Sequence, residues 1–252
     1  MSFTVNPIKF GTDGWRGVIA ADFTFERVAM LAPLAAQVLA DNYGDIANNR
    51  TVIVGYDRRF MAEDFAKLTA TVIQEAGFDV LLSECFAPTP AFSWAAKAHH
   101  ALGAIVLTAS HNPASYLGLK VKSAFGGSVP PEITEQIEAK LGQSLPPADQ
   151  PGKLEMFDPW ASYCQGLQQK VDIAAIKNAI LAEKLKVYVD VMHGAAATGL
   201  ERLLGCPVSE INSDRDPLFG GGAPEPLPKY LPDFFKAINA GAKDYPDSLR
   251  VG

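Results

Sequence analysis

The hydrophobic and polar positions of this chain fall into two alternating kinds of segment. Short apolar runs bounded by turn residues predict strands at residues 51–54, 78–82, 104–107, 186–191 and 208–211. Amphipathic stretches rich in Ala and Leu predict helices at residues 25–41, 62–75, 90–98, 131–141, 173–182 and 195–204. Strands that alternate with helices of this length are typical of βαβ units. The sequence therefore predicts an α/β fold with mostly parallel sheets covered by helices on both faces.

The segment at residues 145–152, LPPADQPG, is the predicted linker between two domains because it has three prolines and no periodicity. We expect two three-layer α/β/α domains with mixed, mostly parallel sheets, at residues 1–146 and 153–252. A helix is predicted at residues 232–240, and a strand pattern then begins at 249–251, where the chain ends. A strand that begins at a terminus lacks the rest of its sheet, so we expect the second domain to be incomplete.

Composition narrows the function classes. The 252 residues suffice for two ordinary domains, and 48% hydrophobic with 20% charged residues is typical of a globular protein. A net charge of -6 argues against nucleic acid as a partner, since binding a phosphate backbone requires a basic surface. No membrane partner is expected, because no long apolar run or signal-peptide pattern is present. The three scattered cysteines, Cys85, Cys164 and Cys206, favour a reducing cytoplasm over a disulfide framework.

The predicted strand at residues 104–107 leads directly into the sequence TASHNP at residues 108–113. This places Ser110 at the carboxyl end of a strand, where α/β sheets bind their ligands. Pro113 ends strand pairing and keeps Asn112 out of the helical region, so Ser110 and His111 are predicted to lie on a stiff, exposed turn. An ordinary strand-exit turn, whose side chains only satisfy the local backbone, is the alternative.

TASHNP, followed by Tyr116, Gly118 and Lys120, closely resembles a motif of the α-D-phosphohexomutases, the phosphoglucomutase and phosphomannomutase family. FGTDGWRG at residues 10–17 and GYDRR at residues 55–59 match further family motifs in the family's order, and VDVMHGA and PEP resemble its second domain. The resemblance implies intramolecular phosphotransfer on glucose or mannose phosphates, from the 1-phosphate to the 6-phosphate, with hexosamine phosphate left open. The transfer would pass through a phosphoserine and a hexose bisphosphate, which also serves as primer.

The resemblance assigns catalytic roles to four residues. Ser110 would carry the phosphoryl group, Arg16 and Lys120 would assist proton transfer, and His111 would hydrogen-bond phosphate or substrate oxygens. A phosphoserine carries nearly two negative charges and three strong acceptors, so it favours a divalent cation and cationic side chains nearby. Acting as a base requires a lowered pKa, which is easier to reach for Lys than for Arg.

Three more residues are expected to bind substrate or phosphate. Thr12 and Asp13 lie beside Arg16 in a glycine-bounded loop, where a purely structural role is equally open, and Asn112 follows the Ser-His pair. The charged residues at 57–59 are predicted to form a charge-paired corner after a strand, which is the commoner role of such clusters.

The family holds its magnesium with a DGDxDR loop in the second domain, and this sequence has no such run. Of the expected Mg²⁺ ligands, only the phosphoryl oxygens on Ser110 would then come from this chain. We therefore expect the chain alone to keep the phosphoserine loop but to have very little mutase activity. A non-catalytic module that binds phosphosugars or a partner is an alternative. An acyl hydrolase built on Ser110 and His111 is a weaker one, because the GxSxG motif is missing.

Overall fold

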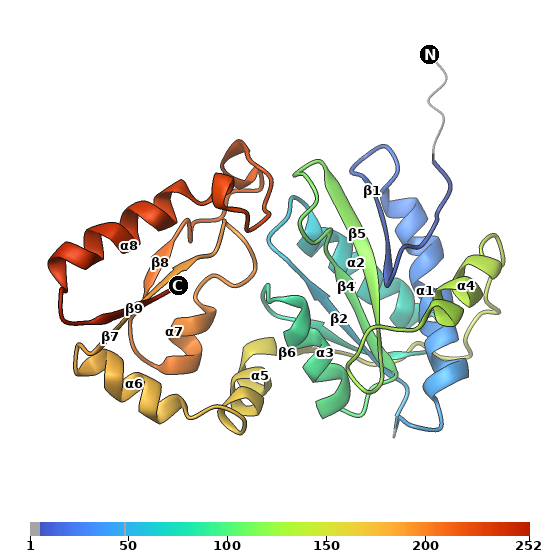
Figure 1. The fold of residues 1–252 in the computed structure, drawn as a ribbon. Coiled ribbons are helices and arrows are strands. Elements are labelled where there is room, and N and C mark those ends of the chain that lie inside the picture. Colours follow the sequence, from blue (N-terminus) through green and yellow to red (C-terminus); the bar gives the residue numbers. More distant parts are fainter. Residues whose placement is uncertain (1–5, 48) are drawn as a thin grey trace, which may run out of the picture. The chain divides into compact units, whose positions relative to one another are not determined.

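The computed structural model describes residues 6–47 and 49–252 (Figure 1). The chain divides into two compact units. One runs to Ser110 and resumes at Ser115–Ser162, and the other takes in His111–Ala114 and Tyr163–Gly252. Each unit has its own sheet with helices packed on it.

The first unit is built on a six-stranded mixed sheet. Its order is β1-β5-β4-β2-β3-β6. Three pairings are parallel, those of β2 with β3, of β2 with β4 and of β3 with β6, whereas β5 runs antiparallel to both β1 and β4. The strands are β1 (Gly14–Val18), β2 (Thr51–Tyr56), β3 (Asp79–Ser83), β4 (Gly103–Leu107), β5 (Tyr116–Ser123) and β6 (Leu154–Phe157). The predicted mixed, mostly parallel sheet is thereby confirmed.

Helices cover both faces of this sheet. The apolar residues of α1 (Phe25–Tyr43), α2 (Ala62–Glu75) and α4 (Pro131–Ala139) form one continuous core with alternate residues of β2, β4 and β5. On the opposite face α3 (Thr89–Ala98) packs against β2 and β4, and its Phe92 ring fills the space over Gly55 that a side chain would occupy. Thr24 starts α1, because its hydroxyl accepts a hydrogen bond from the Arg27 amide at 3.4 Å.

The strand β5 was not among the predicted strands, and its burial explains its position. Leu117, Leu119 and Val121 are fully buried and belong to the core. The alternate positions are Gly118, Lys120 and Lys122, and side chains of a strand alternate between faces, so these three lie on the opposite face. This strand therefore brings two lysines to an interior strand of the sheet, next to the edge strand β1, without placing them in the apolar core.

The segment that follows the predicted linker stays with the first unit. Gly152 N–H donates to the Gln74 carbonyl at 2.9 Å, and Lys153 N–H donates to the Asp79 carboxylate at 2.7 Å. These contacts lead the chain into β6, which extends the sheet beside β3. A fifth helix that was not predicted, α5 (Pro159–Gln168), follows.

The second unit has a three-stranded parallel sheet of order β8-β7-β9. Its strands are β7 (Leu185–Asp190), β8 (Ser209–Ile211) and β9 (Leu249–Val251), and its helices are α6 (Ile173–Leu181), α7 (Gly199–Leu204) and α8 (Pro232–Asp244), with short 3-10 turns at Phe219–Gly221 and Pro228–Tyr230. The Asp172 carboxylate caps α6 by accepting from the Ala175 amide at 2.9 Å. The two units confirm the predicted α/β architecture.

The helix predicted at residues 195–204 is shorter than expected. Thr198 has a positive φ, which a helix does not tolerate, so residues 195–198 form turns and α7 begins at Gly199. Within the described ranges, none of the helices combines the length and the apolar character that crossing a bilayer requires.

Candidate active site

Ser110 is the first exposed residue after a strand whose residues are all buried. Thr108 and Ala109 continue the burial of β4, and Ser110 then turns with a φ of +57°. This left-handed conformation costs a residue with a side chain about 1 kcal/mol, so it persists only where the surroundings hold it. The Thr108 hydroxyl helps to hold it by accepting a hydrogen bond from the Ser110 amide at 3.0 Å. The predicted exposed turn at the strand's carboxyl end is present.

Arg59 fixes both ends of the loop that carries Ser110. Its Nη2 donates to the Ser110 carbonyl at 2.8 Å, and its Nη1 donates to the Tyr116 carbonyl at 3.0 Å. The side chain is only 1% exposed and its Nε lies 3.5 Å from Asp57 Oδ2. Burial lowers the pKa of Arg59, and the Asp57 charge opposes that shift. The predicted charge pairing of this corner is present, and it also shapes the serine loop.

The pairing of β1 with β5 brings Arg16 and Lys120 to one face of the sheet. Gly14 lies opposite Lys120 and Arg16 opposite Gly118, so the two cations are diagonal neighbours. A Cβ at Gly118 would lie 2.9 Å from Arg16 Cγ and 2.8 Å from the Thr108 carbonyl oxygen. The missing side chain therefore lets Arg16 pass over β5 beside the end of β4, two residues before Ser110.

Asp13 connects two lysines at this face. Its Oδ1 lies 3.4 Å from Lys120 Nζ and its Oδ2 lies 2.5 Å from Lys122 Nζ. Lys122 Nζ also donates to Ser128 Oγ at 3.0 Å, and that hydroxyl donates to Asp13 Oδ2 at 3.3 Å. The Asp13 carbonyl accepts from the Val121 amide at 2.9 Å, which ties the loop before β1 to β5.

Asp13 and Lys120 both have pKa values shifted from their ordinary ones. Burial alone would raise the pKa of Asp13, but the hydrogen bond from Lys122 and the charges of both lysines outweigh it and lower that pKa below 3.8. Burial is also the main reason why the pKa of Lys120 is lowered. The Asp13 charge opposes that shift, and Lys122 and Arg16 reinforce it. A lowered lysine pKa makes the neutral amine, which can accept a proton, more accessible.

Comparison with known proteins identifies the family. A family model described as phosphoglucomutase/phosphomannomutase, alpha/beta/alpha domain I, matches residues 7–145, which is more than half of the chain. The model of domain II matches residues 161–245. The chain belongs to the phosphoglucomutase/phosphomannomutase family. The resemblance seen in the sequence motifs is confirmed.

Relatives within the phosphoglucomutase/phosphomannomutase family carry several names. A phosphoglucomutase/phosphomannomutase from Thermococcus kodakarensis is 31% identical over 94% of this chain and 51% of its own length. A phosphoglucosamine/phosphogalactosamine mutase from Sulfurisphaera tokodaii is 32% identical over 86% of this chain and 47% of its own length. A Thermus thermophilus crystal structure described as a putative phosphomannomutase superimposes with a TM-score of 0.81 at 34% identity, covering 98% of this chain and 55% of that one. The chain spans about half the length of these relatives.

The remaining predicted site residues lie on the two loops of the phosphohexomutase motifs. Thr12 is exposed in the turn closed by the hydrogen bond from Gly11 N–H to the Gly14 carbonyl at 2.8 Å. His111 is exposed and Asn112 is half buried, both directly after Ser110. Their proposed roles in binding stay predictions. Sequence reasoning missed Lys122 and Ser128, although the alternation LGLKVK was a readable strand signal.

The described residues do not form a magnesium site of the family type. Among residues 6–47 and 49–252 there is no group of three or more His, Cys, Asp or Glu side chains placed to hold a metal ion. Magnesium prefers six oxygen ligands, and a phosphorylated Ser110 would supply only part of that set. The described residues therefore do not fit a complete magnesium site.

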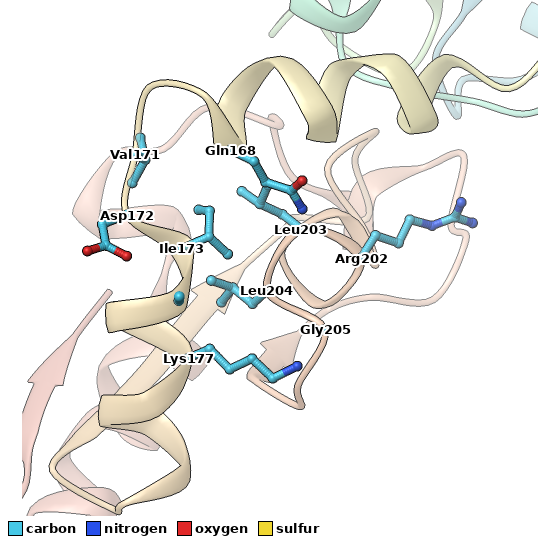
Figure 2. Close-up of a pocket in the computed structure, with 10 residues that line it drawn as sticks. Gln168, Val171, Asp172, Ile173, Lys177, Arg202, Leu203, Leu204 and Gly205 are labelled. Atoms are coloured by element: carbon cyan, nitrogen blue, oxygen red, sulfur yellow. The ribbon is translucent and has the colours of Figure 1, made fainter.

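A pocket of about 510 Å³ in the second unit is not built for this chemistry. Figure 2 shows it between the start of α6 and α7, with Lys177 extending towards Gly205. Its lining combines apolar Val171, Ile173 and Leu204 with the charged Asp172, Lys177 and Arg202, and no serine or threonine hydroxyl is among the residues that line it. The candidate active site of this phosphohexomutase relative is the serine loop.

Proposed function

We propose that this chain carries the phosphoserine loop of a phosphohexomutase, an isomerase that moves a phosphoryl group between positions 1 and 6 of a hexose phosphate. One observation supports this most directly. An exposed serine is held in a strained turn at the end of the buried strand β4, with Lys120 on the neighbouring strand β5 and Arg16 on β1, the next strand along the sheet. Phosphoryl transfer asks little covalent work of a protein and depends on positioning and on charge around the moving group.

In the proposed reaction, phosphorylated Ser110 transfers its phosphoryl group to a hydroxyl of the hexose phosphate. The bond from phosphorus to the sugar oxygen forms as the bond to Ser110 Oγ breaks, and the electron pair of the broken bond stays on Oγ until a proton neutralises it. Lys120 accepts the proton of the attacking hydroxyl, which its lowered pKa favours. Arg16 offsets the negative charge of the phosphoryl oxygens. The hexose bisphosphate then turns and returns its other phosphoryl group to Ser110.

Glucose and mannose phosphates are the proposed substrates, with a hexose bisphosphate as primer. The Thermococcus kodakarensis relative is named for both sugars, and the Sulfurisphaera tokodaii relative is named for amino sugars, so hexosamine phosphates belong in the same test. Mg²⁺ is the proposed cofactor, and when bound it would neutralise charge on the phosphoryl oxygens. A reducing cytoplasm is the proposed location, supported by the odd number and scattered spacing of the cysteines.

Phosphorylation of Ser110 tests the proposal. The chain is incubated with glucose 1,6-bisphosphate and Mg²⁺, and its phosphate is counted by intact mass and located by peptide mapping. We expect one phosphate on Ser110 and none in Ser110→Ala. Ser115→Ala is the matched control, because Ser115 is an exposed serine of the same loop, and this variant should be phosphorylated like the parent. Phosphate that persists in Ser110→Ala, or none in the parent, would refute the proposal.

The phosphorylated chain also tests the choice of sugar. Glucose 1-phosphate, mannose 1-phosphate and glucosamine 1-phosphate are offered separately, and loss of phosphate from Ser110 is followed by mass. Slow single transfers are expected with very little turnover, because the described residues lack a complete magnesium site. Near-normal turnover by this chain alone would contradict that expectation.

A further inference from the structure

The carboxylate of Asp13 is shared unequally between two lysines. Lys122 Nζ approaches one oxygen to 2.5 Å and is also hydrogen-bonded to Ser128, whereas Lys120 Nζ lies 3.4 Å from the other oxygen. Ser128 donates to the same oxygen that Lys122 contacts. Two groups thus hold the carboxylate on the Lys122 side, and only the longer contact remains for Lys120.

This unequal sharing matters because the lysines are poorly solvated. The Lys122 side chain is 8% exposed and that of Lys120 is 15% exposed, so water screens their charges weakly. The charged groups that face Lys120 are Asp13 from the loop before β1, Arg16 from β1 and Lys122 from its own strand. Its partner on β4 is the apolar Val106. Among these groups Asp13 carries the carboxylate, and both lysines contact it.

We propose that Lys122, held by Ser128, is a positioning residue for the transfer reaction: it draws the Asp13 carboxylate to itself and leaves Lys120 able to release its proton. The inference rests on the proposed function, in which Lys120 accepts the proton of the sugar hydroxyl. Lys122 acts in two ways that have the same sign. It takes up the anion that would otherwise stabilise protonated Lys120, and its own positive charge repels that proton.

The causes of the lowered pKa of Lys120 agree with this assignment. Burial lowers the pKa of Lys120 most, Asp13 raises it, and Lys122 lowers it. A purely structural ion pair between Lys122 and Asp13 would stabilise the fold equally well. It would leave the protonation of Lys120 unchanged when Lys122 is replaced. The titration of Lys120 therefore distinguishes a positioning role of Lys122 from a purely structural one.

The test is competitive acylation of the chain with acetic anhydride across a series of pH values, with the product at each lysine measured by mass spectrometry. Only the neutral amine reacts, so the reactivity of Lys120 against pH gives its titration curve. In Lys122→Met we expect this curve to move to higher pH and the reactivity of Lys120 at neutral pH to fall. Exposed Lys97 serves as the internal standard in every sample and should not change.

Two further variants keep the inference falsifiable. Lys122→Arg retains the charge beside Asp13 and should restore the parent titration of Lys120. Ser128→Ala removes one of the two groups that hold Asp13 Oδ2 and should move the curve in the same direction as Lys122→Met, but less. If the tryptophan fluorescence of Lys122→Met shows that this variant does not fold, Ser128→Ala tests the inference in its place.

An unchanged Lys120 curve in folded Lys122→Met or in Ser128→Ala would overturn the inference. The labelling needs no phosphosugar, so its outcome is separate from that of the proposed function. A chain that is never phosphorylated at Ser110 but shows the shift loses the proposed function and keeps the assignment of Lys122 as the group that sets the protonation of Lys120. A chain that is phosphorylated but shows no shift keeps the function and loses the inference.

Discussion

Replacing Arg59 by Met tests whether this residue holds the serine loop. Arg59→Met removes the hydrogen bonds to the Ser110 and Tyr116 carbonyls, which are 2.8 and 3.0 Å long, and the 3.5 Å ion-pair contact with Asp57, whose side chain is 15% exposed. A hydrogen bond from a charged group is worth about 1.5–3 kcal/mol, and breaking a buried ion pair costs about 3–5 kcal/mol. These terms overlap, so we expect the free energy of unfolding of the first unit to fall by about 3–5 kcal/mol.

Guanidinium unfolding followed by tryptophan fluorescence measures this loss in the right part of the molecule. The three tryptophans, at positions 15, 94 and 160, all lie in the first unit, so their fluorescence reports the unfolding of the first unit and not of the second. Lys67→Met is the control, because Lys67 forms an exposed pair with Glu63 at 2.8 Å, and water screens such a pair so strongly that its loss should change stability very little. The reasoning fails if Arg59→Met unfolds within about 1 kcal/mol of the parent, less than the lower end of one charged hydrogen bond.

Two other predictions concern the same face of the first unit. The lowered pKa of Asp13 contributes stability that is fully present above its ordinary value of 3.8 and is lost as the pH falls through the lowered folded value. In Asp13→Asn, guanidinium midpoints should therefore depend less on acid pH and converge with those of the parent at the lowest pH; parallel curves would contradict this. Gly118→Ala should cost about 1–3 kcal/mol by the same fluorescence assay, because the new Cβ would lie 2.7 Å from the Trp15 carbonyl oxygen and 2.9 Å from Arg16 Cγ. A variant as stable as the parent would show that the strands separate freely there.

The chemistry of the serine turn was readable from the sequence because its causes are local. A fully apolar run followed by TASHNP predicts a buried strand and then a stiff, exposed turn, and the structure has the buried strand and the exposed turn. The charge pair of Asp57 and Arg59 was also predicted, since the two residues are neighbours after a strand. The contact of Arg59 with the Ser110 carbonyl was not, because 51 residues separate them.

The sequence by itself determined the alternation of strands and helices, the family and the identity of the residue on the turn. Only the tertiary structure decided which charges meet. Lys122 reaches Asp13 across 109 residues, and it does so because β1 and β5 pair in one particular register. Because side chains alternate along a strand, the sequence tells which residues of one strand share a face. Which residues of other strands lie beside that face depends on how strands that are distant in the sequence pair. Since no local pattern encodes that register, the partner of each lysine emerged only from the folded sheet.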